Sequence, residues 1–238
     1  GKTTLMRMVN AMVTPTSGTV FVRGRDVAGE NPVHLRRSIG YVLQEGGLFP
    51  HRTVADNVAT VPRLEGTPAR EARERARELL DLVGLEPDLA RRYPAQLSGG
   101  QRQRVGVARA LANRADILLM DEPFGALDPL VRADLQRELK EIQAALGTTI
   151  LFVTHDVDEA FTLGDQVAVL SRGGRIEQVG APSNLLSSPA SEFVADFVGA
   201  SRAARPVRLA GPGNLLVDEE GTPVGTLTPG SGGEGTAS

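Results

Sequence analysis

A serine, two glycines and a glutamine at residues 98–101 have the spacing of a helix start that binds an anion. Ser98 and Gln101 fit a capping box, in which the Ser98 hydroxyl accepts from the amide of residue 101 and Gln101 reaches back to the amide of residue 98. Gly99 and Gly100 leave the amides of the first turn uncovered, and a helix N-terminus favours negative charge. Alone, this pattern also fits an ordinary capped surface helix. Together with the segments described next, it predicts a helix that faces phosphate.

Two carboxylates follow a run of apolar residues further along the chain. Residues 117–120 are Ile, Leu, Leu and Met, and Asp121 and Glu122 come directly after them. This pattern predicts a buried parallel strand with acids at its carboxyl end, the edge at which open α/β sheets bind their ligands. Asp121 suits a Mg²⁺ ion, and Glu122 suits the orientation of a water that attacks a terminal phosphate.

The chain opens with Gly1-Lys2-Thr3-Thr4, which matches the closing G-K-[ST] of a phosphate-binding P-loop. The glycine that opens this motif and the residues between are not in the sequence, which does not begin with methionine. We therefore expect the first residue to lie inside the motif. We also expect the chain as given to bind a phosphate-bearing nucleotide poorly and to turn it over slowly, because backbone donors to the phosphates would be missing.

In these motifs the chain resembles the nucleotide-binding subunit of ABC transporters, and the resemblance covers about its first 200 residues. Six motifs occur in that family's order. They are the end of Walker A at 1–4, the Q-loop at Gln44, the signature at 97–101, Walker B at 117–122, the D-loop at 125–128 and the switch histidine at His155. All six in order, at plausible spacings, are far more specific than any one of them.

The resemblance implies ATP and Mg²⁺ as cofactors and gives each motif residue a role. The catalytic candidates are Glu122, His155 and Gln44. The nucleotide-binding candidates are Gly1, Lys2, Thr3, Thr4, Ser98, Gly99, Gly100, Gln101 and Asp128. The metal candidates are Thr3, Gln44 and Asp121.

The resemblance also implies the partners. Two such subunits meet head to tail, so that ATP lies between Lys2 of one chain and the signature of the other, and Asp128 communicates across the seam. Residues 44–57 would contact transmembrane permease subunits, and an extracytoplasmic solute-binding protein would act indirectly. The chain would then work at the cytoplasmic face of the cell membrane as a peripheral protein. Whether the paired ATPase subunits are identical stays open.

The fold class expected is α/β: a P-loop NTPase of the ABC ATPase type, with a parallel-sheet core, a small antiparallel β lobe and a helical subdomain that carries the signature. We expect the ATP-binding domain over residues 1–200, the helical subdomain over about 53–112, and a flexible tail over 201–238, which is rich in Gly, Pro and Thr.

Several local patterns predict the elements that position these residues. Strands are expected at 18–24, 39–43 and 149–153, and the last of these delivers His155 at its carboxyl end. Helices are expected at 5–9, at 67–83 and from the Asp128 N-cap to Gly147. A hairpin is expected over 166–179.

Composition narrows the functional class. The formal net charge of −3 does not indicate a nucleic-acid footprint, so we expect no nucleic-acid partner. The sequence contains no cysteine, which excludes disulfides and thiol chemistry. No apolar run approaches the ~20 residues that cross a bilayer. We therefore expect any role of the chain at a membrane to depend on partner proteins.

Residues 35–44, 47–54 and 192–199 are most similar to the ATPase subunits of osmoprotectant importers, which carry glycine betaine, choline, carnitine or proline betaine. The first alternative is another ABC import system, for amino acids or small anions. The second alternative is an ABC ATPase that does not work in transport. Such proteins commonly carry two fused ATPase units or long coiled coils, and neither is visible in the sequence.

Overall fold

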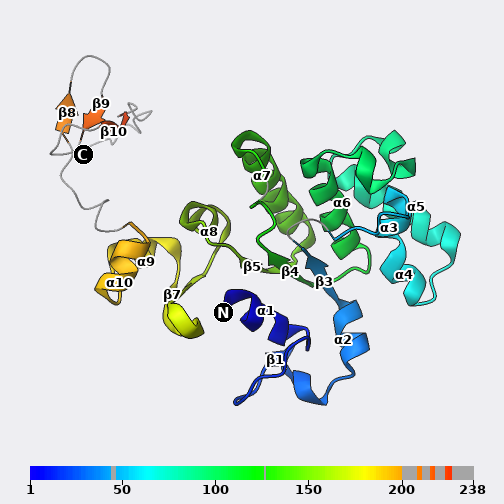
Figure 1. The fold of residues 1–238 in the computed structure, drawn as a ribbon, viewed down its shortest axis with the longest axis horizontal. Coiled ribbons are helices and arrows are strands. Elements are labelled where there is room, and N and C mark those ends of the chain that lie inside the picture. Colours follow the sequence, from blue (N-terminus) through cyan, green and yellow to red (C-terminus); the bar gives the residue numbers. More distant parts are fainter. Residues whose placement is uncertain (44–46, 126, 200–207, 211–214, 218–222, 227–238) are drawn as a thin grey trace, which may run out of the picture.

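The computed structural model describes residues 1–43, 47–125, 127–199, 208–210, 215–217 and 223–226. At its centre is a parallel sheet in the order β3 (Ile39–Val42), β4 (Ile117–Asp121) and β5 (Thr149–Val153). Ile39 pairs with Ile117, and Asp121 pairs with Val153. The carboxyl ends of these strands therefore meet at one edge, and the predicted parallel-sheet core is confirmed (Figure 1).

The two faces of β4 are covered by different helices. Leu118 and Met120 pack in a core cluster with residues of α5 (Ala69–Leu82), α6 (Gly99–Leu111) and α7 (Pro129–Leu146). Leu119, on the opposite face, packs with Met6 of α1 (Lys2–Val9). All three strand residues are at most 1% exposed. Full burial of such a side chain contributes about 1.5–3 kcal/mol, so the alternation along β4 places α1 and α6 on opposite faces of the sheet.

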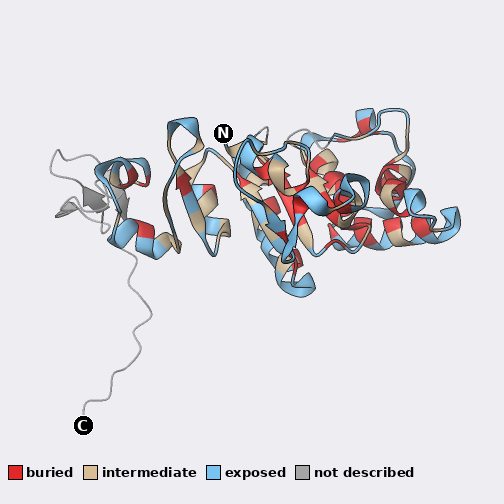
Figure 2. Cartoon of the chain, turned by 90° about the horizontal axis from the view of Figure 1, so that it is seen from below, coloured by how far each residue is buried: buried red, intermediate tan, exposed pale blue. Residues whose placement is uncertain are grey.

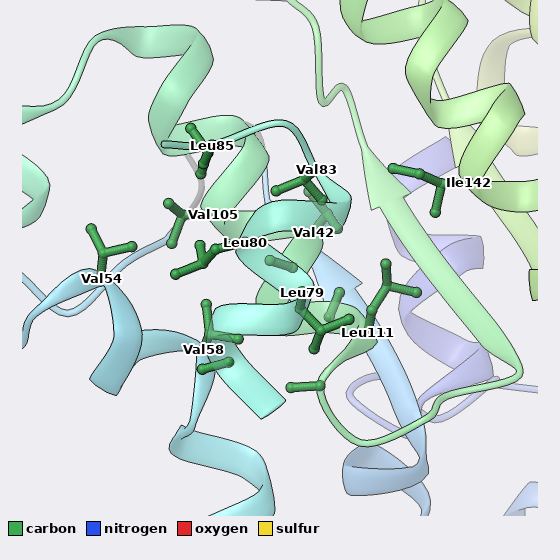
Figure 3. Packing of buried hydrophobic residues seen from close by; sticks show 14 of the residues in the cluster. Val42, Val54, Val58, Leu79, Leu80, Val83, Leu85, Val105, Leu111 and Ile142 are labelled. Atoms are coloured by element: carbon green, nitrogen blue, oxygen red, sulfur yellow. The ribbon is translucent and has the colours of Figure 1, made fainter. Parts of the chain in front are cut away.

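The segment expected to form a helical subdomain is helical over most of its length, from the Thr53 N-cap of α3 to the Ala112 C-cap of α6. It consists of α3 (Val54–Val58), α4 (Thr60–Leu64), α5, two short 3₁₀ helices (Pro87–Arg91 and Pro94–Gln96) and α6. Its interior is built from aliphatic side chains of α3, α5 and α6 (Figure 3). Figure 2 shows that buried residues concentrate here and around the parallel sheet.

One close approach ties this subdomain to the sheet. A Cβ atom at Gly40 of β3 would lie 2.5 Å from the carbonyl oxygen of Ala110 in α6. Only glycine lets the last turn of the signature helix come this near to the strand.

Two hairpins lie outside the parallel sheet, and the first is smaller than expected. The strand predicted over 18–24 is wrong in extent, since only Phe21–Val22 is extended, as β1, and it pairs with β2 (Arg25–Asp26). Arg23 and Gly24 have φ of 51° and 73° and form the turn of this hairpin. The second hairpin, β6 (Val167–Leu170) and β7 (Ile176–Gly180), agrees with the prediction over 166–179.

Six further helices and 3₁₀ turns occur in the described part of the chain. They are a 3₁₀ turn at Val27–Gly29, α2 (Pro32–Ser38), α8 (Val157–Leu163), a 3₁₀ turn at Arg172–Gly174, α9 (Pro182–Ser187) and α10 (Glu192–Phe197). Among the described helices, none has the length and apolar composition of a membrane-spanning segment.

Within the segment expected to be a flexible tail, three short strands form an antiparallel sheet in the order β10-β9-β8. They are β8 (Arg208–Ala210), β9 (Leu215–Val217) and β10 (Pro223–Thr226). Short apolar runs between Gly- and Pro-containing segments favour such strands, although the composition of the whole segment predicted none.

Candidate functional site

Helix α1 begins at the residues that match the end of a P-loop. Gly1 is its N-cap and carries no side chain to accept from the first-turn amides, so these donors point outward from the helix start. Met6 is 1% exposed and anchors the helix, which packs on β5. The prediction of a helix over 5–9 is confirmed, and the helix extends back to Lys2. Lys2 and Thr3 are therefore held in the first turn, beside donors that suit an anion.

Thr3 and Asp121 meet at the carboxyl edge of the sheet. The Thr3 hydroxyl donates to Oδ1 of Asp121 across 3.0 Å, although the two residues are 118 positions apart in the sequence. The contact exists because α1 packs on β5, whose neighbour β4 ends at Asp121. A hydroxyl and a carboxylate brought together in this way are hard oxygen donors of the kind that Mg²⁺ prefers.

Glu122 follows Asp121 in a backbone conformation that side chains rarely adopt. Its φ is 46°, in the left-handed region, which costs a non-glycine residue roughly 1–2 kcal/mol. Its amide donates to the carbonyl of Val153 at 2.8 Å and fixes this turn against β5. Strain held in place by the surrounding sheet is typical of functional positions.

His155 lies against this carboxylate. Its Nδ1 atom is 3.2 Å from Oε2 of Glu122. The His155 side chain is 67% exposed and the Glu122 side chain is 31% exposed, so both can be reached from solvent. The structure thus brings together Thr3, Asp121, Glu122 and His155.

The signature residues form the predicted capping box. The Ser98 hydroxyl accepts from the amide of Gln101 at 3.2 Å, and Oε1 of Gln101 accepts from the amide of Ser98 at 2.9 Å. The two glycines differ. A Cβ atom at Gly100 would lie 2.8 Å from Cγ1 of Val131, whereas at Gly99 the nearest atom, on Leu127, would be 3.6 Å away. Gly100 is thus required by the contact with α7 as well as for open amides.

The structure does not bring the signature to the P-loop end of the same chain. The start of α6 lies against Leu127 and Val131, on the face of the sheet opposite to α1. A Cβ atom at Gly1 would instead approach Gly174, at 3.1 Å. One chain therefore presents its two phosphate-binding candidates at separate places.

The D-loop leads into α7. Asp128 is the N-cap of this helix, and its Oδ1 atom accepts from the amide of Val131 at 3.0 Å, as predicted. Gly147 closes the helix with a φ of 63°, also as predicted. Ala126, in the middle of the D-loop, lies outside the described residues.

Gln44 lies outside the described residues as well, so the structure gives it no place. Residues 49–53 are fixed by Asn57, which is fully buried. Its side-chain nitrogen donates to the carbonyls of Phe49, Arg52 and Thr53, and its oxygen accepts from the Phe49 amide at 2.7 Å. Phe49 stays 41% exposed, with the Arg52 guanidinium 5.0 Å from its ring centre. Residues 49–53 thus have a hydrogen-bonded backbone and an exposed aromatic side chain.

Comparison with known proteins agrees with this geometry. The family profile described as ABC transporter matches residues 1–125, which is more than half of the chain. The chain belongs to the ABC transporter family. The matched residues of this chain include α1, the parallel strands β3 and β4, and α6, the helix that begins at the signature.

Two curated relatives have almost the same sequence identity to this chain. The glycine betaine/carnitine/choline transport ATP-binding protein OpuCA of Bacillus subtilis is 52% identical over 202 residues, covering 85% of this chain and 53% of that protein. The spermidine/putrescine import ATP-binding protein PotA of Thermobifida fusca is 51% identical over 201 residues, covering 84% and 51%. The chain spans about half the length of these ABC transporter relatives.

A solved ABC cassette has the same fold. The dimeric post-hydrolysis state of the ATP-binding cassette MJ0796 bound to ADP and Pi has a TM-score of 0.67 and 34% identity, and the match covers 76% of this chain and 80% of that chain. The predicted ABC ATPase fold class is confirmed.

Sequence reasoning missed one group of residues beside the ABC transporter motifs. Glu159 contacts both Arg132 and Thr154, the residue before His155, and links them in one network. Each belongs to an ordinary helix or loop pattern in the sequence, and only the packing of α7 beside α8 brings them together. No local signal in the sequence marks them.

Proposed function

We propose that this chain is the ATP-binding and ATP-hydrolysing subunit of a membrane importer. The observation that carries the proposal is the group at the carboxyl edge of the sheet, where Thr3 contacts Asp121 at 3.0 Å and Glu122 lies 3.2 Å from His155. Hydrolysis of a nucleoside triphosphate needs a phosphate-binding site, a metal ligand and a base for water at one place, and this edge offers a candidate for each. Membership of the ABC transporter family supports the same function.

The phosphates would be held by the start of α1. Lys2 supplies a compact positive charge next to the amides of the first turn, and Gly1 leaves these amides open. Thr4 lies in the same turn. The donor set here suits β- and γ-phosphate oxygens.

The residues also fit Mg²⁺. Thr3 and Asp121 offer a hydroxyl and a carboxylate. Mg²⁺ typically binds through one or two carboxylates together with substrate phosphates. Gln44 is a further proposed ligand. When bound, the ion would neutralise charge that develops on the phosphates.

Glu122 is the proposed general base. Its carboxylate accepts a proton from water as the water oxygen bonds to the γ-phosphorus and the bond to the bridging oxygen of ADP breaks, and the proton leaves later with phosphate or solvent. The turn at Glu122, tied to Val153, points the carboxylate at a fixed place. Nδ1 of His155 lies 3.2 Å from this carboxylate and would orient it, and the exposed imidazole would meet the γ-phosphate.

A second copy of the subunit completes the site in this proposal. The signature of one chain lies on the face of the sheet opposite to α1, so it cannot serve the phosphates at its own Lys2. A head-to-tail pair would place Ser98, Gly99 and Gly100 of the partner subunit, with their open helix start, against the γ-phosphate. Gln101 stabilises that helix start by accepting from the Ser98 amide in the capping box. Asp128, the N-cap of α7, would lie at the interface between the two subunits.

We place the chain at the cytoplasmic face of the membrane, as a peripheral subunit bound to permease subunits through the loop around Phe49. Asn57 fixes the backbone of this loop, so the exposed Phe49 ring is presented without a large ordering cost. An extracytoplasmic solute-binding protein would deliver the solute. Phe49→Ala is expected to keep the ATPase activity of the isolated subunit and to lower solute uptake.

The proposed solutes are osmoprotectants, quaternary amines such as glycine betaine and choline. Support comes from residues 35–44, 47–54 and 192–199 and from the 52% identity to OpuCA. Polyamine import is the second candidate, because PotA is 51% identical over nearly the same length. Uptake of labelled betaine, choline and spermidine by cells that express the importer separates the two, since each alternative predicts transport of one class only.

Replacement of Glu122 by Gln tests the hydrolytic role, in the assembled importer and with a complete phosphate-binding loop ahead of Lys2. The amide keeps the shape of the side chain but cannot take a proton. We expect ATP binding within about twofold of the parent and turnover lowered by at least ~10²-fold. Unchanged steady-state turnover would refute the assignment of the base. Glu71→Gln, on the exposed face of α5, is the matched control and should leave turnover unchanged.

A further inference from the structure

Arg132, in the first turn of α7, faces two segments that are far apart in the sequence. Its Nη2 atom donates to the carbonyl oxygen of Leu127, in the D-loop, at 3.3 Å. On its other side, Nη1 lies 3.5 Å from Oδ2 of Asp156, and Nε lies 3.7 Å from Oε1 of Glu159. One guanidinium thus spans the D-loop and the start of α8.

The two carboxylates hold the loop that carries His155. Oδ1 of Asp156 caps α8 by accepting from the amides of residues 158 and 159. Oε2 of Glu159 accepts from the Thr154 hydroxyl at 2.7 Å, and the same hydroxyl accepts from the amide of Asp156 at 2.9 Å. The residues on both sides of His155 are therefore fixed by the groups that Arg132 faces.

Burial makes these contacts more consequential than ordinary surface pairs. The Glu159 side chain is 6% exposed, and those of Arg132 and Asp156 are 29% and 34% exposed. By contrast, the Arg137–Asp134 pair on the same helix is 67% and 48% exposed. A carboxylate as buried as that of Glu159 is costly to leave without a positive partner. The planar fork of arginine can face three acceptors at once, whereas an ammonium group on a lysine stem cannot span the same positions.

We propose that Arg132 is a positioning residue that couples the carbonyl of Leu127 in the D-loop to the loop that carries His155. The inference rests on the proposed function, in which His155 holds the base Glu122 and the D-loop lies at the seam with a second subunit. The path runs from Leu127 through Arg132 to Asp156 and Glu159, and from His155 to Glu122. A displacement of the D-loop carbonyl moves the guanidinium, and the guanidinium moves the loop that sets His155 against Glu122.

A double-mutant cycle tests this coupling by single-turnover hydrolysis in the assembled importer. Arg132→Lys is expected to slow the chemical step about 10-fold while the Kd for ATP stays within about twofold, because a positioning defect lowers rate without loss of binding. If Arg132 acts through His155, the double variant Arg132→Lys/His155→Ala is no slower than His155→Ala alone. Full additivity of the two losses would overturn the proposal.

Asp156→Asn is the second variant, for the case in which Arg132→Lys does not fold. Asparagine is an equally good N-cap, so the helix start is preserved while the charge facing Arg132 is lost. It should also lower the rate with little change in ATP affinity, and a rate equal to the parent's would contradict the proposal. Arg137→Lys, an exposed arginine of the same helix, should leave rate and affinity unchanged.

The outcome is separable from that of the proposed function. If Glu122→Gln keeps full turnover, the hydrolytic site itself is wrong. If Glu122→Gln stalls turnover while the Arg132 and His155 losses simply multiply, only the coupling is wrong.

Discussion

The Nδ1 atom of His155 lies 3.2 Å from Oε2 of Glu122, although the two residues come from the ends of different strands. The contact follows from sheet register: Asp121 pairs with Val153, so the residues that follow β4 and β5 leave the sheet side by side. A carboxylate in a left-handed backbone position and a solvent-facing imidazole are thereby held as one unit.

Loss of the His155 ring is predicted to affect chemistry more than binding. His155→Ala should lower the rate of ATP hydrolysis by about 10²-fold, because Glu122 loses the group that orients it, while the Kd for ATP changes by less than about threefold. Rapid-quench kinetics and equilibrium titration measure the two quantities. His34→Ala, on the exposed surface of α2, serves as the control. A weakened Kd with an unchanged rate would contradict the role given to His155.

The hydroxyl of Thr3 is predicted to control the metal requirement. Thr3→Ser keeps the donor to Asp121 and should need the same Mg²⁺ concentration for half-maximal hydrolysis, whereas Thr3→Val removes the oxygen and should raise that concentration at least ~10-fold. Chelation of Mg²⁺ should abolish turnover in all three proteins. Equal Mg²⁺ curves for the valine and serine variants would show that this hydroxyl is not a ligand.

Gly100 and Gly99 are predicted to differ in their tolerance of alanine. Gly100→Ala pushes a methyl group against Val131 and should lower the free energy of unfolding by about 1–3 kcal/mol. Gly99→Ala has room and should be neutral or slightly stabilising by comparison, since alanine favours helix. Denaturant unfolding measures both. Val131→Ala should restore the stability of the Gly100→Ala variant, and failure to do so would remove the steric explanation.

Asp56 gives a prediction for pH. Its hydrogen bond from Arg73, the largest cause, and that from Thr53 lower the pKa of this carboxyl below its usual value. A carboxyl with a lowered pKa in the folded state stabilises the protein above the pKa of the unfolded chain, about 4 for Asp, and this stabilisation is lost as pH falls through the folded value.

Asp56→Asn should therefore lower the free energy of unfolding by about 1 kcal/mol near pH 7 and progressively less below about pH 4. The measurement is chemical denaturation of both proteins at a series of pH values. Asp134→Asn, in an exposed pair on α7, should show a much smaller effect. A difference between Asp56→Asn and the parent that does not shrink in acid would contradict the ion-pair explanation.

Much of the fold and of the site could be predicted from local signals. The apolar run before Asp121, the capping box at Ser98 and the Asp128 N-cap are each set by neighbours in the chain, and the structure has all three. The extent of β1 could not be predicted, because the positive φ at Arg23 accompanies side-chain contacts to Ser38 and Asp116.

The steric role of Gly100 and the network around Arg132 were missed for the same physical reason. Both depend on the way α7 packs against α6 and α8, which no spacing in the sequence encodes. Contacts between residues distant in the chain are visible only once the helices are placed.

The central claim is that the phosphates bound at Lys2 of one subunit meet Ser98 of the partner subunit. Lys2→Ala and Ser98→Arg subunits, each expected to be inactive alone, provide the most direct measurement when they are mixed. In a head-to-tail pair, one composite site of each mixed dimer keeps both parent residues, so ATPase activity should recover to about a quarter of the parent level in an equal mixture with independent sites. If the signature served its own chain, no site would be intact, and activity no higher than that of either variant alone would contradict the account.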